Sequence, residues 1–197
     1  KIKIKNGYIF AEAKKGLIGS KVKLPSISVG ATENVIIAAS YAKGTSYIKN
    51  CACEPEIKNL TDFLKKMGVK INWIGKRSVK IQGTQNLTNT KHRIMFDRIE
   101  AGTFVIAGAL AAKKLIVTGI ETKVMTKELN IIKKMGVKLR VGSGEVTVLN
   151  SQKLKPISIT TEPYPGFPTD LQAQIMVLMT KAKGISKIKE NIFENRF

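Results

Sequence analysis

The chain has 197 residues, of which 43% are hydrophobic and 24% are charged, a balance typical of a folded globular protein and not of a disordered one. No apolar run approaches the roughly 20 residues that span a bilayer, which argues against a transmembrane helix. The formal net charge of +20, from 34 basic and 14 acidic residues, implies attraction to anions such as nucleic acid, acidic lipid or phosphorylated small molecules.

Only 5 of the basic residues are arginines, and the lysines are spread along the whole chain. Proteins that read nucleic acid usually cluster their charge and use arginine for bidentate contacts, so this distribution argues against nucleic acid as a partner. If they lay in a strand, the two cysteines, Cys51 and Cys53, would point to opposite faces. That spacing suits neither a disulfide framework nor a metal site, and the simplest compartment is a reducing cytoplasm.

The predicted elements begin with a hairpin, because "KIKIK" and "YIFAEAK" read as strands and are joined by Asn6-Gly7, a pair typical of a tight turn. This alternation lacks the apolar block of a signal peptide. A unit of the order β-α-β-α-β-β follows. Its elements are a strand at 21–24, an apolar helix at 30–42, a strand at 45–50, an amphipathic helix at 55–67 and strands at 69–74 and 78–82. Pro55 suits the first turn of the second helix and Gly68 its end.

The same order repeats, and "KKMGVK" occurs at both 65–70 and 133–138. The second unit is predicted to contain a strand at 93–96, a helix at 100–112, a strand at 115–120, a helix at 126–135 and strands at 137–141 and 145–149. A third unit begins with a strand at 157–161, a helix from Thr169 and a strand at 185–190. The fold class is therefore α/β (α+β) with repeated β-α-β-α-β-β units, and we expect the chain to be a piece of a longer repetitive protein.

The loop "TEPYPGFPTD" at 161–170 contains three prolines and ends on a single acid, Asp170. Thr169 and Gln172 have the spacing of a capping box, which predicts that the helix begins at Thr169 and that Asp170 lies in its first turn. An acid in that position is stabilised by the helix dipole without any function. The alternative is that the stiff loop presents the carboxylate to a ligand.

Other helix starts leave similar alternatives open. The segment "SVGAT", from Ser28, offers backbone N–H groups to an anion, although small residues there also serve close helix packing. Glu54 opens a helix and Asp97 follows a strand, so each carboxylate could cap a helix or form a salt bridge.

Five motifs together resemble the UDP-N-acetylglucosamine 1-carboxyvinyltransferase family over essentially the whole chain. They are "SVGATEN" (28–34), "EPEI" (54–57), "DRIEAGTF" (97–104), "FPTDLQAQ" (167–174) and "FENRF" (193–197). The resemblance implies an inside-out α/β barrel fold of six β-α-β-α-β-β units in two three-unit lobes around a cleft. On this basis residues 1–90 are expected to be the last part of the first lobe, and residues 91–197 the first part of the second.

The resemblance also implies a reaction, in which enolpyruvyl passes from phosphoenolpyruvate to the 3′-hydroxyl of UDP-N-acetylglucosamine and phosphate is released. This is the first committed step of peptidoglycan synthesis, in the cytoplasm, and it needs no cofactor or metal. Asp170 matches the aspartate that binds the sugar and acts as general base. The implied contacts to UDP-N-acetylglucosamine are Ser26, Ile27, Ser28, Val29, Asp170 and the backbone of Ile192. Further residues expected at the cleft are Gly30, Glu54, Asp97 and Arg196.

One departure is Ser26, where many members of the family carry lysine. Other family site residues cannot be placed in this chain, so we expect it to be inactive alone, or to bind the nucleotide sugar weakly, with a complementary fragment of the same enzyme as a possible partner. Two alternatives are kept: a fragment similar to the sister enzyme 3-phosphoshikimate 1-carboxyvinyltransferase, and a basic nucleic-acid-binding repeat protein.

Overall fold

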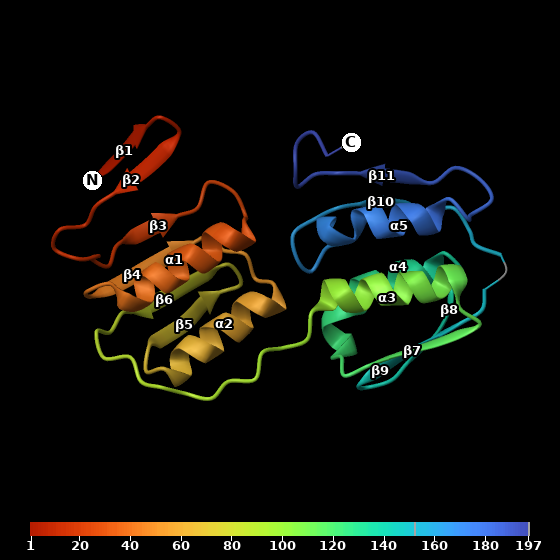
Figure 1. The fold of residues 1–197 in the computed structure, drawn as a ribbon, viewed down its shortest axis with the longest axis horizontal. Helices are drawn as coiled ribbons and strands as arrows, with labels where there is room; N and C mark the ends of the chain where they lie inside the picture. The colour runs from red at the N-terminus through yellow and green to blue at the C-terminus, as the bar shows by residue number, and fades with distance from the viewer. Residues whose placement is uncertain (152, 197) are drawn as a thin grey trace. The chain divides into compact units, whose positions relative to one another are not determined.

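The computed structural model describes residues 1–151 and 153–196 (Figure 1). The chain divides into two compact units, Lys1–Ile94 and Met95–Phe197. Each unit is considered by itself. The assignment of residues 1–90 and 91–197 to two lobes of a longer enzyme stays a prediction.

The first unit opens with the hairpin of β1 (Ile2–Lys5) and β2 (Tyr8–Ala11), which pair antiparallel. Asn6 and Gly7 connect them with φ angles of 50° and 77°. Two consecutive positive φ angles define the tight turn that Asn-Gly favours, so the predicted hairpin is confirmed.

The rest of the first unit is a four-stranded sheet with two helices. The elements are β3 (Lys21–Lys23), α1 (Val29–Tyr41), β4 (Thr45–Lys49), α2 (Pro55–Lys66), β5 (Lys70–Gly75) and β6 (Ser78–Gln82). The strand order is β3-β4-β6-β5, with β3 and β4 parallel and the other pairs antiparallel. The cross-strand pairs Ile48–Val79 and Ile71–Ile81 are buried, and they form a core with Ile36 of α1 and Ile57 of α2.

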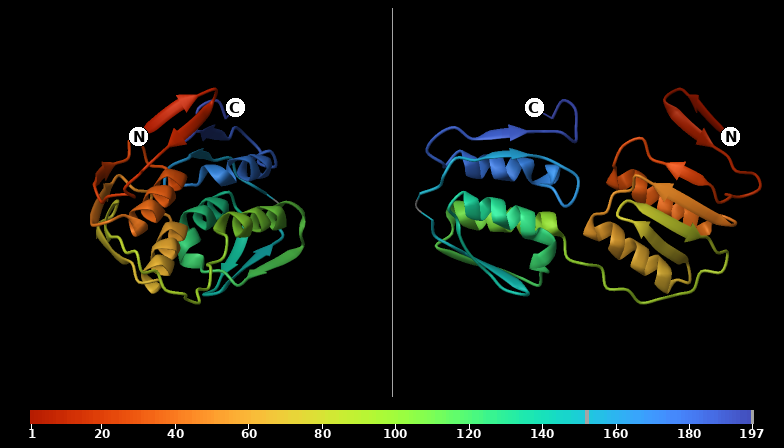
Figure 2. Two further views of the ribbon diagram at one scale, coloured as in Figure 1. Left: turned by 60° about the vertical axis from the view of Figure 1, so that its left-hand side comes forward. Right: turned by 180° about the vertical axis from the view of Figure 1, so that it is seen from behind.

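The second unit places its helices between two sheets, as the views in Figures 1 and 2 show. Its elements are α3 (Arg98–Ala111), β7 (Lys114–Thr118), η1 (Thr122–Met125), α4 (Thr126–Lys134), β8 (Lys138–Val141), β9 (Glu145–Leu149), β10 (Ser158–Thr160), η2 (Thr169–Leu171), α5 (Gln172–Met179) and β11 (Lys187–Lys189). One sheet has the order β7-β9-β8 and the other is the parallel pair β10-β11. The shared core contains Val105, Ile132, Phe167 and Ile175.

The internal repeat is visible in how the strands pair. In the first unit the hairpin β5–β6 pairs antiparallel with β4, and in the second unit the hairpin β8–β9 pairs antiparallel with β7. Gly68 and Gly136 follow the equivalent helices α2 and α4 with φ angles of 99° and 93°. These positive φ angles are the reason both copies of "KKMGVK" carry glycine after the helix.

One prediction about local structure is wrong. Residues 93–96 form no strand, and Ile94 is 80% exposed. This segment crosses the boundary between the two units, and it contributes no strand to the sheet β7-β9-β8 of the described residues. Cys51 and Cys53 follow β4, which ends at Lys49, in a buried loop. No helix in the described part of the chain is both long and apolar enough to cross a membrane.

Candidate active site

The proline-rich loop from Thr161 to Pro168 is closed on itself by backbone hydrogen bonds. The amide of Glu162 donates to the carbonyl of Phe167 at 3.0 Å, and the amide of Gly166 donates to the carbonyl of Pro163 at 2.9 Å. Phe167 is fully buried in the core of the second unit. A Cβ atom at Gly166 would lie 2.4 Å from the Cβ of Glu162, so the loop requires glycine there. The loop therefore leads into η2 along a defined path.

Asp170 lies in η2 and its side chain is 60% exposed, so the carboxylate is not held in packing. The Nη2 atom of Arg196 lies 3.9 Å from its Oδ1 atom. The structure thus brings together two of the residues predicted for the site, Asp170 and Arg196. An exposed carboxylate next to a guanidinium is available to a ligand on one side and paired on the other.

The predicted capping box at Thr169 and Gln172 is wrong. The helical turn does begin at Thr169 with Asp170 in its first turn, as predicted, but no side chain caps its amide groups. The hydroxyl of Thr169 instead donates to Oε2 of Glu190 at 2.8 Å and accepts a hydrogen bond from Nη1 of Arg196. Because the hydroxyl group of Thr169 donates to one distant residue and accepts from another, it does not cap the first turn of the helix.

Glu190, which the sequence did not single out, joins several parts of this site. Its Oε1 accepts hydrogen bonds from Oγ1 of Thr161 at 2.8 Å and from the amides of Ile192 at 2.7 Å and Phe193 at 3.2 Å. Burial opposes ionisation of this carboxyl group, but the hydrogen bonds from Ile192, Thr169, Thr161 and Phe193 together hold the pKa of Glu190 below its ordinary value.

Ile192 and Arg196 lie in the segment that follows Glu190. The N–H of Ile192 is already donated to Glu190, so its carbonyl oxygen is the backbone group left for a nucleotide contact. Arg196 lies over the ring of Phe193, 5.0 Å from its centre, and donates to the carbonyl of Thr169 at 3.3 Å. Its guanidinium is thereby oriented toward the end of the proline-rich loop.

In the first unit, the segment Ser26–Gly30 leads into α1. Ser28 is the N-cap, and its hydroxyl oxygen accepts a hydrogen bond from the amide of Ala31 at 3.3 Å. Ser26 and Gly30 are exposed, whereas Ile27 and Val29 are partly buried against the core. A Cβ atom at Gly30 would meet nothing within 4 Å, so close helix packing does not explain this glycine. The exposed start of α1 remains available to an anion.

The alternatives for Glu54 and Asp97 are resolved differently. Asp97 caps α3, since its Oδ1 accepts hydrogen bonds from the amides of Ile99 at 2.7 Å and Glu100 at 3.2 Å. The capping explanation is therefore confirmed for Asp97. Glu54 stands before α2 without a side-chain capping bond, and it is 5% exposed. The side-chain capping explanation for Glu54 is wrong.

A second feature that the sequence did not indicate is a buried ion pair. Nη1 of Arg98 lies 3.1 Å from Oε1 of Glu128, with side-chain exposures of 7% and 2%. The guanidinium of Arg98 also lies over the ring of Tyr164, 5.6 Å from its centre. This pair joins α3, α4 and the proline-rich loop. Its partners are 30 residues apart, so no local sequence signal could have paired them.

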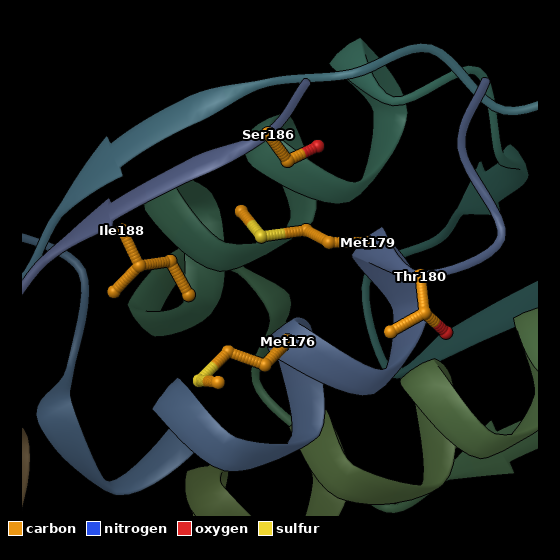
Figure 3. Close-up of a pocket in the computed structure, with 5 residues that line it drawn as sticks. All are labelled: Met176, Met179, Thr180, Ser186 and Ile188. Atoms are coloured by element: carbon orange, nitrogen blue, oxygen red, sulfur yellow. The ribbon is translucent and has the colours of Figure 1, made fainter. Parts of the chain in front are cut away.

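Two pockets in the second unit do not contain the predicted site residues. One, of about 330 Å³, lies between α5 and β11 and is lined by Met176, Met179, Thr180, Ser186 and Ile188. Figure 3 shows the side chains of Met176 and Met179 lying between the helix and Ile188 of β11. These side chains carry no charge, so this pocket suits apolar groups rather than phosphate. A larger pocket, of about 720 Å³, runs along α4 and β10 and is lined in part by Lys127, Lys133 and Lys134.

The environment of the two cysteines does not favour nucleophilic chemistry. Burial raises the pKa of the Cys51 thiol to about 11, an effect that the positive charge of Arg77 offsets only in part. Both cysteines are buried, with Cys53 5% exposed. Since the thiolate is the reactive form, Cys51 is unreactive at neutral pH.

Comparison with solved structures identifies the fold. The enolpyruvyl transferase NikO from Streptomyces tendae superimposes with a TM-score of 0.85 at 24% identity, covering 100% of this chain and 50% of that one. The EPSP synthase from Acinetobacter baumannii gives a TM-score of 0.60 at 18% identity, covering 88% of this chain and 40% of that one. At these sequence identities the superpositions establish the fold alone, and the predicted enolpyruvyl transferase fold is confirmed.

The family follows from sequence comparison. The family model described as EPSP synthase (3-phosphoshikimate 1-carboxyvinyltransferase) matches residues 1–197, and the chain belongs to this family. The UDP-N-acetylglucosamine 1-carboxyvinyltransferase of Pelagibacter ubique (strain HTCC1062) is 55% identical over 197 residues, which are 100% of this chain and 47% of that protein. The enzymes of the same name from Chelativorans sp. (strain BNC1) and Brucella ovis are 46% identical, and the chain covers 46% of each. The predicted resemblance is thus confirmed, and the chain spans about half the length of these relatives.

Proposed function

We propose that the protein containing this chain transfers the enolpyruvyl group of phosphoenolpyruvate to the 3′-hydroxyl of UDP-N-acetylglucosamine, a cytoplasmic step of peptidoglycan synthesis. The observation that carries this proposal is the exposed carboxylate of Asp170, held at the end of a closed proline-rich loop beside Arg196. The 55% identity to the Pelagibacter enzyme of that name supports the choice of acceptor.

The proposed chemistry follows from the position of this carboxylate. The sugar hydroxyl must lose a proton as it attacks, and a positioned carboxylate is a suitable general base. The guanidinium of Arg196 lies 3.9 Å from Oδ1 of Asp170, so a cation stands beside one side of the carboxylate. The loop limits the directions in which Asp170 can point, and positioning supplies a large share of such a rate enhancement.

We propose nucleotide-sugar contacts in each unit, considered by itself. In the first unit these are Ser26, Ile27, Ser28 and Val29, where the exposed start of α1 offers positive potential to a diphosphate. In the second unit they are Asp170 and the carbonyl oxygen of Ile192. Gly30, Glu54, Asp97 and Arg196 remain secondary candidates, and Asp97 also caps α3. Ser26 supplies no cation for a diphosphate.

The 197 residues cover 47% of the Pelagibacter enzyme, so we propose activity for the whole protein and none for this chain alone. A complementary part of the same enzyme is the proposed partner. The exposed hairpin β1–β2, with Ile2, Ile4 and Ile9 each more than 70% exposed, is a surface that such a part could cover.

The test is phosphate release by the protein translated from the full reading frame around these residues. With phosphoenolpyruvate present, we expect release with UDP-N-acetylglucosamine and none with shikimate 3-phosphate. Release with shikimate 3-phosphate alone would favour the sister activity that the family description names. Release with neither acceptor would refute both assignments.

A further inference from the structure

The carboxylate of Glu190 connects two segments that approach each other only in the folded chain. Glu190 directly follows β11, and its Oε2 accepts the hydroxyl of Thr169, which lies 21 residues earlier at the end of the proline-rich loop. Its Oε1 accepts the amide of Ile192 at 2.7 Å and that of Phe193 at 3.2 Å. Oγ1 of Thr161, at the start of the loop, donates to the same oxygen at 2.8 Å.

These contacts are adjacent to each residue proposed for the site in this unit. Thr169 precedes Asp170, and it receives the Arg196 guanidinium on both its carbonyl and its hydroxyl oxygen. Ile192 is itself a proposed nucleotide contact. The side chain of Glu190 therefore joins the loop that carries Asp170 to the segment that carries Ile192 and Arg196, beside the direct bonds from Arg196 to Thr169 and from the amide of Asn191 to Oγ1 of Thr161.

We propose that Glu190 is a positioning residue, whose carboxylate holds Asp170 and Arg196 in register with the backbone of Ile192. We assign Glu190 no substrate contact; it acts through the hydroxyl of Thr169 and through the amides of Ile192 and Phe193. Its significance for catalysis rests on the proposed function, whereas the connection itself does not.

The chemistry of the cluster requires an acceptor that is ionised. Four donors converge on the two oxygens of Glu190, and a carboxylate accepts all of them without supplying a proton. Glutamine would place an amide N–H group against one donor, and at the Thr169 side the hydroxyl already accepts from Arg196. Charge-assisted hydrogen bonds are also about twice as strong as neutral ones.

The charged groups around the cluster are few in the described part of the chain. Arg196 is joined to it through Thr169, and Asp170 is joined to Arg196. Lys189 and Glu162, the sequence neighbours of Glu190 and Thr161, are exposed, and so is Glu194, which follows Phe193. A titration observed at the amides of Ile192 and Phe193 can therefore be assigned to Glu190 if it persists both in Asp170→Asn and in Glu194→Gln.

The first test is a pH titration of backbone amide resonances in the 197-residue chain. We expect the Ile192 and Phe193 amides to shift with a midpoint below that of an ordinary glutamate, in both the wild type and Asp170→Asn. In Glu190→Gln this shift should disappear, and in the matched control Glu194→Gln, an exposed residue of the same segment, it should remain. Amides that do not respond to pH in the wild type, or that still titrate in Glu190→Gln, would overturn the proposal.

The second test measures UDP-N-acetylglucosamine affinity and turnover in the full-length protein. Loss of a hydrogen bond to a charged group corresponds to about 10- to 100-fold, and we expect Glu190→Gln to lose this much while Glu145→Gln, at an exposed glutamate of β9, stays near wild type. Wild-type behaviour of Glu190→Gln would overturn the positioning role. If the wild type neither binds nor turns over the nucleotide sugar, the proposed function fails, and the titration still decides whether Glu190 connects the two segments.

Discussion

Replacing Glu128 by alanine should destabilise the second unit strongly. The change leaves the guanidinium of Arg98, 7% exposed, without the carboxylate that lies 3.1 Å away. Breaking a buried ion pair from one side costs about 3–5 kcal/mol. A domain of this size is stable by about 5–15 kcal/mol, and its melting temperature falls by about 4–8 °C for each kcal/mol lost. The expected decrease is therefore roughly 12–40 °C.

Calorimetry and urea unfolding, followed by near-ultraviolet circular dichroism, measure this effect. The matched control is Asp62→Ala in α2, because the Asp62–Lys65 pair is exposed, with side-chain exposures of 60% and 42%, and should contribute at most about 1 kcal/mol. The double variant Arg98→Met with Glu128→Met should lose less stability than Glu128→Ala, since it leaves no buried charge. The reasoning is refuted if Glu128→Ala and Asp62→Ala have the same effect.

Three further predictions concern separate features. Folding lowers the pKa of Glu190 from its ordinary value near 4.5, so the contribution of Glu190 to stability is complete above that value and is lost as the pH falls through the folded pKa. The free energy of unfolding, measured between pH 2 and 6, should therefore decrease toward low pH in the wild type and decrease less in Glu190→Gln. Gly102→Ala should lower the free energy of unfolding by about 1–3 kcal/mol, because the new Cβ would lie 2.6 Å from Cδ1 of the buried Leu171. Gly30→Ala, where the Cβ meets nothing within 4 Å, should not destabilise the chain. Chemical denaturation compares the two variants, and equal losses of stability would contradict the packing of Gly102 on Leu171. Cys51, with a pKa of about 11, should resist alkylation at pH 8 until the chain unfolds, as mass spectrometry of the labelled peptide would reveal, and rapid labelling in the native state would be inconsistent with its burial.

The parts of the fold that the sequence predicted are those with local signals. Asn6-Gly7 specifies its turn by backbone preference, and the "KKMGVK" segments place a glycine where each helix needs a positive φ angle. The three hairpins, β1–β2, β5–β6 and β8–β9, follow from alternation and short connections. These features depend on neighbours within a few residues, so they can be inferred without a structure.

The parts that the sequence missed depend on partners distant in the chain. Thr169 has the spacing of a capping box, but its hydroxyl bonds to Glu190, 21 residues away, where the carboxylate is a stronger acceptor. Residues 93–96 have a strand-like sequence but no strand beside them in the described sheets. Asp170 was selected by motif resemblance and loop stiffness, whereas the arrangement of Glu190 and Arg196 around Thr169 required coordinates.

The most direct measurement is kcat for Asp170→Asn in the full-length protein, with Asp62→Asn as control. If Asp170 removes the proton from the sugar hydroxyl, its replacement lowers kcat by about 10²- to 10⁴-fold, while the control leaves kcat unchanged. A kcat for Asp170→Asn within threefold of wild type, on the order of 0.7 kcal/mol in the barrier, would contradict the assignment of this carboxylate as the base.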